Sequence, residues 1–401
     1  MRRSGVTGGR VDCPNGIAFT NADAQRTEWR ESGDGQLTDR RLTSYLEKAG
    51  ADALLTAEPG LVRMLAGHAA DVASGPSPFQ LPAAVLAPGD GPSRLICSVD
   101  EAPEGDWVHT YEGFTAGPTD PVSGAGEAFR QALESAGLQK ARVVVDMATV
   151  PASLASGISG RPAAAPALGA LGAVKTDAEV TAIEESVRLC DVGQAAAREA
   201  TVAGATELDL WAHVTAAIER HAGQRVTIVA DLVCGPRTAG VGGPPSSRPV
   251  AEGELVICDL VPRLDGMWGD CCATWAVGRP PRWAGDLHTT CMEALSQGLD
   301  ALRPGAMAGE IDALVRSVVR SGGYEYPHHT GHGLGFRWHE EPRIIPGAEV
   351  VIETGMVVAL EPGGYRDGRG LRVEQVAVVT DDGARVLSQH PLAIATPGGV
   401  S

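Results

Sequence analysis

The sequence predicts a two-domain α/β protein, in which an N-terminal α/β domain precedes a larger domain built from two similar halves. The first observation is length, because 401 residues are too many for one ordinary hydrophobic core. The second is the alternation of helical and short apolar segments from Leu37 to about residue 170. The third is a helix–helix–strand order that occurs twice after residue 171, without a visible sequence repeat.

Two boundaries divide the chain. Residues 1–35 are rich in Gly, Arg and Asp, lack hydrophobic periodicity and are predicted to form a poorly ordered tail. Residues 36–170 are assigned to the N-terminal domain, and residues 171–401 to the second domain. The boundary between the two domains lies in a stretch of small residues, Gly and Pro, which is typical of a linker.

Helical and extended segments alternate in the N-terminal domain. Leu42, Tyr45 and Leu46 recur at helical spacing, and Gly50 closes that helix. Short apolar runs typical of buried strands then occur at residues 52–56, 83–88, 94–99 and 141–147.

The second domain opens with a capping box, because Thr176 and Glu179 have the required spacing. Two apolar helical stripes follow, carried first by Val180, Ile183, Val187 and Cys190, and then by Trp211, Val214 and Ile218. We expect strands at 225–233, 254–261 and 267–277, helices at 283–302 and 309–321, and further strands at 350–361 and 371–380.

Charge and composition exclude several classes of partner. The chain has 33 basic and 50 acidic residues, and its net charge of −17 repels nucleic-acid phosphates and anionic lipids. No run of about 18 apolar residues is present to span a membrane. The start of the chain lacks the apolar core of a secretory signal, and the 8 cysteines are scattered without a CxxC motif. We therefore expect a cytoplasmic protein with reduced thiols, no nucleic-acid or membrane partner and no structural zinc site.

Two stretches could form hairpins that bury acidic pairs. A four-residue loop at 263–266 would place Asp259 directly opposite Asp270, and a two-residue turn at 367–368 would place Glu361 opposite Glu374. Opposite residues share one face of a sheet, with Cβ atoms ~5 Å apart. The neighbouring positions are apolar, so each hairpin is expected to bury two like charges, which is costly unless a cation neutralises them.

A histidine segment, "HHTGHGLGFRWHEEP" from His328 to Pro342, offers a further ligand. His332 stands between two glycines, which allow close approach of the backbone. Four carboxylates and one imidazole suit two divalent ions, Mn²⁺ or otherwise Fe²⁺, Co²⁺ or Zn²⁺. Each feature alone is more often a solvated turn or an ordinary loop, so the prediction depends on finding all three in one chain.

The order of these residues resembles the pita-bread metallopeptidase family, which includes methionine aminopeptidase, aminopeptidase P, prolidase and the metal-free relative creatinase. The matching motifs are Asp259 with Asp270, Gly331–Gly335, His339-Glu340, Glu361-Pro362-Gly363 and Arg372-Val373-Glu374. The resemblance covers about 172–392, and more weakly 37–168. It implies a creatinase-like α/β domain followed by a pita-bread domain with two pseudo-symmetric halves.

The resemblance also implies roles for these residues. Asp259 would bind one metal ion, Asp270 and Glu374 would bridge both, and His332 and Glu361 would complete the other shell. A metal-activated water would attack an amide or related bond of a small peptide or amino-acid-derived substrate. The implied catalytic residues are His328, His339 and Arg372. The resemblance further implies a homodimer, whereas His329 receives no role and is expected to be exposed.

The pocket departs from the family's pattern in two places. The loop before the first aspartate usually carries a histidine, and here that position falls near Gly242. Trp338 stands where a small aliphatic residue is usual. These changes predict weak hydrolysis of ordinary Xaa-Pro peptides and leave three hypotheses open: an Xaa-Pro peptidase, a non-peptidase metalloenzyme cleaving a C–N or similar bond in a small amino-acid-like substrate, and an inactive binding module. The filled ligand positions disfavour the last.

Overall fold

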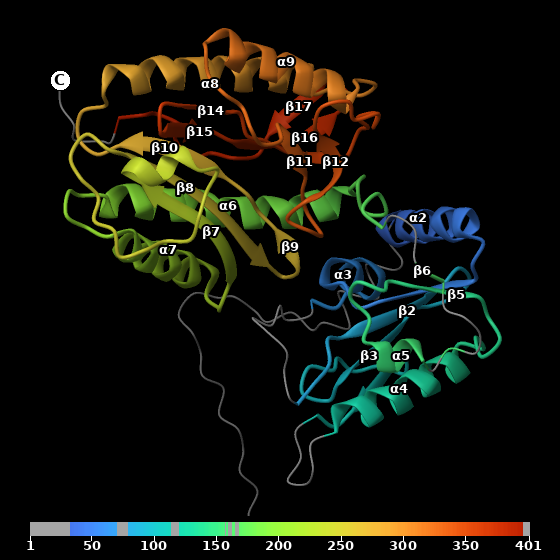
Figure 1. The fold of residues 1–401 in the computed structure, drawn as a ribbon. Helices are drawn as coiled ribbons and strands as arrows, with labels where there is room; N and C mark the ends of the chain where they lie inside the picture. The colour runs from blue at the N-terminus through green and yellow to red at the C-terminus, as the bar shows by residue number, and fades with distance from the viewer. Residues whose placement is uncertain are drawn as a thin grey trace, which may run out of the picture.

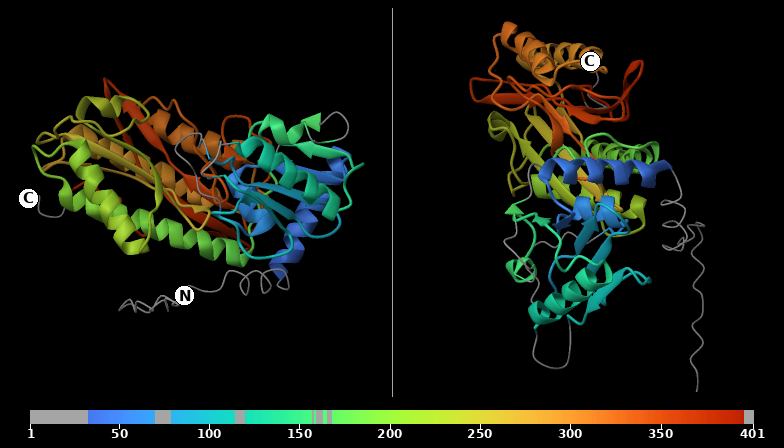
Figure 2. Two further views of the ribbon diagram at one scale, coloured as in Figure 1. Left: turned by 90° about the horizontal axis from the view of Figure 1, so that it is seen from below. Right: turned by 90° about the vertical axis from the view of Figure 1, so that its right-hand side faces the viewer.

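The computed structural model describes residues 33–69, 79–113, 120–156, 158, 163–164 and 168–395. The predicted tail at 1–35 lies outside these ranges except for residues 33–35, which form the first turn of a helix. Two bodies stand side by side, a smaller N-terminal one and a larger one (Figures 1 and 2). In the part of the chain that is described, no helix is long and apolar enough to cross a membrane.

The N-terminal domain is a six-stranded mixed sheet in the order β4-β3-β2-β1-β5-β6. Its elements are α2 (Gly33–Ala49), β1 (Ala53–Thr56), α3 (Pro59–Ala66), β2 (Ala84–Pro88), β3 (Arg94–Ser98), β4 (Val108–Tyr111), α4 (Pro121–Ser135), β5 (Val143–Val145), α5 (Ala152–Ala155) and β6 (Ala163–Ala164). Figure 1 shows α2 and α3 on one side of this sheet and α4 and α5 on the other.

Both faces of this sheet are covered, which explains why its strands read as continuous apolar runs. Successive side chains of β1 point to opposite faces, so Leu54 belongs to the same buried cluster as Leu46 of α2, whereas Leu55 belongs to the cluster that contains Phe129 of α4. The strands predicted at 52–56, 83–88, 94–99 and 141–147 correspond to β1, β2, β3 and β5.

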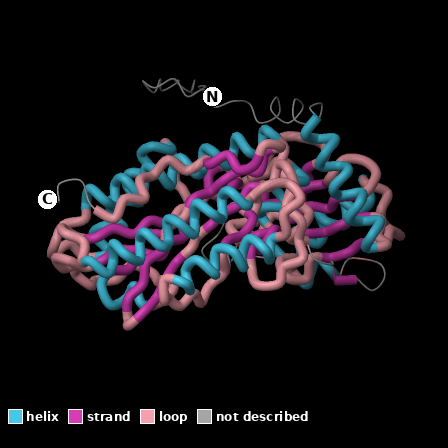
Figure 3. The backbone as a smooth tube through the Cα atoms, turned by 90° about the horizontal axis from the view of Figure 1, so that it is seen from above, coloured by secondary structure: helices cyan, strands magenta, loops and turns pink. Residues whose placement is uncertain are grey.

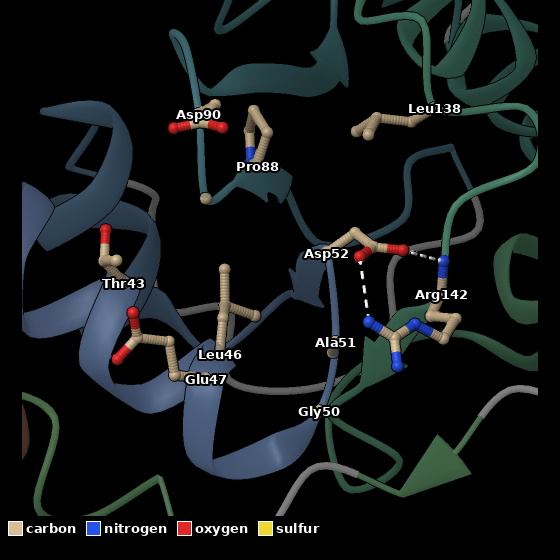
Figure 4. A pocket seen from close by; sticks show the side chains of 11 residues that line it. Thr43, Leu46, Glu47, Gly50, Ala51, Asp52, Pro88, Asp90, Leu138 and Arg142 are labelled. Carbon is tan, nitrogen blue, oxygen red and sulfur yellow. Dashed lines mark hydrogen bonds and ion pairs between the residues drawn. The ribbon is translucent and has the colours of Figure 1, made fainter.

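A cavity of about 430 Å³ opens on the N-terminal domain between the end of α2 and the strands β1 and β2 (Figure 4). The Asp52 carboxylate at its wall accepts hydrogen bonds from the Arg142 backbone at 2.7 Å and from the Arg142 guanidinium at 3.2 Å. These bonds join the starts of β1 and β5, so Asp52 and Arg142 stabilise the sheet.

The larger domain repeats one order of elements. The first half contains α6 (Asp177–Ala200), α7 (Glu207–Ala222), β7 (Thr227–Cys234), the 3₁₀ helix η1 (Gly235–Ala239), β8 (Leu255–Leu264), β9 (Met267–Trp268) and β10 (Cys272–Ala276). The second contains α8 (Arg282–Ala301), α9 (Ala308–Ser321), β11 (Gly331–Gly333), β12 (Glu340–Ile344), β13 (Val357–Leu360), β14 (Gly363–Arg366), β15 (Arg369–Arg372), β16 (Gln375–Thr380) and β17 (Gly383–Val386).

Helices α8 and α9 lie above the strands of this domain in Figure 1, whereas α6 and α7 pack against β8 and β7. Figure 3 shows the helices and strands of the chain from above. The inner layer holds the sheets β10-β8-β7 and β12-β11-β13-β16-β17 and the β14-β15 hairpin. The predicted capping box of Thr176 and Glu179 is present, with Glu179 N donating to Thr176 Oγ1 at 3.2 Å. The repeated order confirms two similar halves.

The two domains meet at the segment that leads into His339. The start of α3 lies directly against this segment, because a Cβ added at Gly60 would lie 2.2 Å from the Phe336 carbonyl oxygen. The Arg337 guanidinium pairs with Glu58 at 3.1 Å. The larger domain therefore holds this segment from one side while the N-terminal domain holds it from the other.

A buried ion pair fixes the same segment from inside the larger domain. The Lys175 ammonium, which is fully buried, pairs with the Glu340 carboxylate, which is 2% exposed. Burial raises the pKa of Glu340, and the neighbouring Lys175 opposes that shift. The pair joins the start of the larger domain to β12 and to the adjacent His339.

Lys175→Met should therefore lower the free energy of unfolding by about 3–5 kcal/mol, because it leaves Glu340 buried without its cation. Lys175→Met/Glu340→Gln should recover part of the loss. Denaturant unfolding followed by tryptophan fluorescence measures both. Arg188→Met is the control, since its ion pair with Glu185 is about half exposed and should contribute less than about 0.5 kcal/mol. A loss in Lys175→Met no larger than in this control would contradict the interpretation.

Candidate metal centre

The candidate site lies where the two halves of the larger domain meet. The first half supplies Asp259 on β8 and Asp270 just before β10, and the second supplies His332, Glu361 and Glu374. Hydrogen bonds cross the seam beside these residues: Glu374 N donates to Cys272 O at 2.9 Å, and Thr274 Oγ1 donates to Arg372 O at 2.7 Å. These hydrogen bonds fix the distance between the two acidic hairpins.

The register predicted for the first hairpin is wrong by two residues. Asp265 and Gly266 form a two-residue turn with φ of 46° and 84°, so Asp259 lies opposite Cys272 and not opposite Asp270. Asp-Gly supplies the two left-handed residues that such a turn requires. Because the shift is even, both carboxylates stay on one face as diagonal neighbours.

The register predicted for the second hairpin is confirmed. Asp367 and Gly368 form its turn with φ of 52° and 72°, and Gly363 pairs with Arg372. Leu360 pairs with Gln375 in the same register on the other side, so Glu361 and Glu374 occupy opposite positions.

Three carboxylates converge on one point. Oxygen atoms of Asp259, Asp270 and Glu374 all lie within 4.8 Å of one another. Burial raises the pKa of Asp259 to about 6, and burial together with the neighbouring carboxylates raises the pKa values of Asp270 and Glu374 well above their usual range. Glu374 Oε1 is buried and has no hydrogen-bond partner.

His332 presents a free lone pair to this group. Its Nδ1 lies 3.0 Å from the Gly333 carbonyl oxygen, which only accepts, so Nδ1 carries the proton and Nε2 is bare. That Nε2 lies 3.4 Å from Glu361 and 3.5 Å from Asp270, an arrangement of acceptors facing acceptors. A cation between them resolves the repulsion, so these residues fit a divalent metal that takes oxygen and imidazole ligands.

The glycines beside His332 are required by close backbone contacts, as predicted. A Cβ at Gly331 would lie 2.1 Å from Ala359 O, and a Cβ at Gly333 would lie 2.1 Å from Glu341 O. Strand β11 is therefore pressed between β12 and β13, which leaves His332 1% exposed and fixed in direction.

His329 is partly buried beside the candidate ligands, and the prediction that it is exposed is wrong. Its Nε2 donates to Glu361 Oε1 at 2.6 Å, and its side chain is 22% exposed. Burial alone would raise the pKa of Glu361, but the neighbouring imidazoles, first of all His329, outweigh burial and hold that pKa well below its usual range. His329 thus fixes the orientation of a carboxylate that faces the candidate centre.

The two predicted catalytic histidines have opposite hydrogen-bonding capacity. His328 Nδ1 donates to His329 O at 2.8 Å, and its buried Nε2 has no partner and can only accept. His339 Nδ1 accepts from Arg343 at 3.1 Å, so its proton is on Nε2. The His339 ring stacks on His332 with centroids 3.7 Å apart.

His329, His332 and His339 have nitrogen atoms within 4.8 Å of one another, but they do not form a separate imidazole metal site. The Nε2 atoms of His329 and His339 both carry protons, as their partners require. His332 is therefore the histidine of this group with a lone pair for a metal.

Arg372 supplies positive charge within the acidic group. It is 2% exposed, and its Nη2 donates to Asp259 at 2.5 Å. Its Nε lies 3.8 Å from Glu361, and its Nη1 donates to the carbonyl oxygen of Val241 in the loop after η1. Arg372 is therefore placed to orient Asp259 and to tie that loop to the site.

The missing side chain at Gly242 does not leave open space beside the candidate centre. A Cβ at Gly242 would lie 1.7 Å from Asp231 Oδ2, so the Asp231 carboxylate already fills the volume beside this glycine. Asp231 was not predicted as a site residue. It lies opposite Asp259 because β7 pairs with β8, and nothing in the local sequence around Asp231 indicates this pairing. Trp338 is 42% exposed and lies beside His339, with ring centroids 6.3 Å apart, so it adds aromatic surface next to the site.

Comparison with known proteins places the chain in a family. Residues 181–381 match the model of metallopeptidase family M24. The probable dipeptidase PepE of Mycobacterium tuberculosis is 33% identical over 222 residues, 54% of this chain and 59% of that protein. The Xaa-Pro dipeptidase of Pyrococcus furiosus is 30% identical over 219 residues, which cover 54% of this chain and 63% of that protein.

Solved structures extend the likeness to the N-terminal domain. The dipeptidase PepE of Mycobacterium ulcerans superposes with a TM-score of 0.70 at 26% identity, over 91% of this chain and 98% of that one. A prolidase from Thermococcus sibiricus superposes with a TM-score of 0.75 at 22% identity, over 92% and 100%. These likenesses confirm the predicted pita-bread fold. The chain belongs to metallopeptidase family M24.

Removal of one central carboxylate should abolish metal binding. We expect the wild-type protein, purified with Mn²⁺, to hold about two ions per chain, and Asp270→Asn and Glu374→Gln to hold almost none, because each contributes to the point where the carboxylates converge. Elemental analysis by mass spectrometry measures this. Asp300→Asn, at an exposed position on α8, is the matched control. Full occupancy in either site variant would contradict the assignment.

His339→Ala should lower turnover about 10²–10⁴-fold, since it removes a positioned donor, while metal content and melting temperature stay at their wild-type values. Steady-state kinetics, elemental analysis and thermal melts together check this. A variant that unfolds, or one that turns over normally, would show that this histidine is structural.

Proposed function

We propose that the protein is a metal-dependent hydrolase of the Xaa-Pro dipeptidase, or prolidase, type. The observation that carries the proposal is the convergence of four carboxylates and the bare Nε2 of His332 on one buried point. Such a set of acceptors is stable only with cations among them. Membership of metallopeptidase family M24 supports peptide hydrolysis as the reaction.

We assign the metal ligands as Asp259, Asp270, His332, Glu361 and Glu374, which would hold two divalent ions. Bound divalent metal supplies Lewis acidity, which polarises a carbonyl group and acidifies a water. Mn²⁺ is our first choice, because the ligands are mostly hard oxygen donors, with Fe²⁺, Co²⁺ and Zn²⁺ as alternatives.

Four side chains of the protein would bind the substrate or hold the ligands in position. His339 has its proton on Nε2 and would donate a hydrogen bond to the substrate carbonyl oxygen as negative charge develops there. His328, with a bare Nε2, would accept a hydrogen bond from a substrate N–H. Arg372 and His329 would hold Asp259 and Glu361 in position.

The substrate class rests on the relatives. Their names include Xaa-Pro dipeptidase, prolidase and dipeptidase. Matched regions span about three fifths of the length of the curated relatives. We carry these names over as a proposal: the substrate is a small peptide with proline after its first residue. A homodimer is a further proposal that rests on the same resemblance. A cytoplasmic location is a proposal that rests on the scattered cysteines and on the lack of an apolar secretory signal at the start of the sequence.

A second candidate is a non-peptidase metalloenzyme acting on a small amino-acid-like substrate. The observation that favours it is the replacement of a loop histidine by Gly242, with the Asp231 carboxylate in the adjoining space. That change exchanges a neutral or positive group for a negative one beside the candidate centre.

Hydrolysis of a panel of Xaa-Pro dipeptides by the Mn²⁺-loaded protein tests the proposal. The missing loop histidine predicts weak hydrolysis of ordinary Xaa-Pro peptides, but the complete ligand set and the Asp231 carboxylate that fills the space beside Gly242 change this expectation. We now expect at least one peptide to be cleaved with a kcat/KM of roughly 10⁴ M⁻¹s⁻¹ or more, and His339→Ala to lose that activity. Cleavage of small amides, amidines or betaines in place of every peptide would favour the second candidate. Failure to cleave any of these compounds in the metal-replete state would leave a binding role.

A further inference from the structure

Asp231 is a carboxylate beside the candidate metal centre that no ligand role accounts for. It lies on β7, directly opposite Asp259 in the antiparallel pairing with β8. Like charges at directly opposed positions destabilise a sheet. An acidic residue at this position therefore disfavours the folded sheet unless another group compensates for it.

The compensation within the protein is incomplete. Arg372 Nη2 lies 3.6 Å from Asp231 Oδ2, beyond hydrogen-bond distance, and the same atom donates to Asp259 at 2.5 Å. Within the described ranges, the Asp231 side chain makes no hydrogen bond, and it is 38% exposed. Its oxygen atoms therefore retain their capacity to accept hydrogen bonds from a ligand.

The surrounding backbone holds Asp231 in place. The loop carrying Gly242 lies against the carboxylate, at a separation where a Cβ would meet Oδ2 at 1.7 Å. That loop is fixed in turn, because Leu232 N donates to Gly243 O at 3.0 Å and Arg372 donates to the Val241 carbonyl oxygen. The Asp231 carboxylate is therefore held in a fixed position beside the candidate metal centre.

Charge gives the class of ligand. Asp231 and the four candidate ligand carboxylates carry five negative charges, which Arg372 and two divalent ions would balance, so no excess positive charge would remain beside Asp231 for an anion. The free carboxylate of a dipeptide would be repelled by Asp231 and would lie away from it. The N-terminal residue of the peptide then lies nearer to Asp231.

We infer that Asp231 is a specificity residue that pairs with a positively charged side chain on the N-terminal residue of the substrate. The preferred substrates are then Lys-Pro and Arg-Pro peptides. This inference rests on the proposed function, because it names the substrate class of the same site. The group recognised is the ammonium or guanidinium of the side chain, since an α-ammonium is common to all dipeptides and gives no selectivity among them.

A matched pair of substrates isolates that charge. Lysine and norleucine side chains have the same carbon skeleton, and lysine adds the ammonium group. We expect wild-type kcat/KM for Lys-Pro to exceed that for norleucyl-proline by about 10-fold or more, and Asp231→Asn to bring the ratio close to one, because a hydrogen bond to a charged group is lost. Asp300→Asn, which changes the net charge equally on α8, should keep the wild-type ratio.

A binding measurement separates this inference from the proposed function. Titration calorimetry of the Mn²⁺-loaded protein with free L-lysine and L-norleucine should show tighter binding of lysine, by a similar factor, in the wild type and not in Asp231→Asn. If the wild type cleaves Xaa-Pro peptides without preferring Lys-Pro, or if Asp231→Asn keeps the preference, the inference is overturned and the proposed function stands.

If the wild type cleaves no peptide, the proposed function fails. Calorimetry alone then tests whether Asp231 binds a cationic side chain. Tighter binding of lysine that depends on Asp231 would then support a cationic substrate of another kind. Equal binding of the two amino acids, or no binding of either, would overturn the inference.

Discussion

Repulsion among buried hydrogen-bond acceptors is the constraint on which the rest of the larger domain depends. Four carboxylates and one bare imidazole nitrogen face a common point, and Arg372 is the guanidinium that pairs with them. Neither half of the domain could assemble this set alone, because each supplies only part of it. Outer helices, paired sheets and the hydrogen bonds across the seam hold together groups that would otherwise separate.

The histidine segment shows how hydrogen bonds decide chemical roles. His328, His329, His332 and His339 lie close together, yet each has a different partner at one ring nitrogen. Carbonyl partners leave His328 and His332 with bare Nε2 atoms, whereas Glu361 and Arg343 require protons on the Nε2 atoms of His329 and His339. One imidazole is thereby free for a metal, and another is ready to donate to developing negative charge.

Much of the site could be predicted from sequence because turn chemistry is local. Asp367-Gly368 fixed the second hairpin correctly, and the flanking glycines of His332 are explained by contacts at 2.1 Å. The predicted register of the first hairpin was wrong by two residues. Asp265-Gly266 is the same turn signal, but the prediction placed it within a four-residue loop. Asp259 and Asp270 still lie on one face of the sheet, because side chains alternate with a period of two and a shift of two residues does not change the face.

Long-range pairing explains what the sequence analysis missed. Asp231 meets Asp259 only through the register of β7 against β8, whose connection contains η1 and an irregular loop without a decisive turn signal. The contact of His329 with Glu361 joins residues 32 positions apart and depends on the path of the chain before β11. The packing of α3 on Phe336 likewise joins two domains. Local sequence patterns do not show which residues far apart in the chain come into contact, so these contacts could not be predicted.

The seam between the halves has a thermodynamic consequence. A ligand that binds only the native state stabilises it in proportion to the logarithm of the free ligand concentration over its Kd. Because the acceptors come from both halves, an ion bound among them acts as a cross-link between α6–β10 and α8–β17. Resistance of this protein to heat and to proteolysis would then vary with the free metal in its surroundings, and a chelator would behave as a mild denaturant.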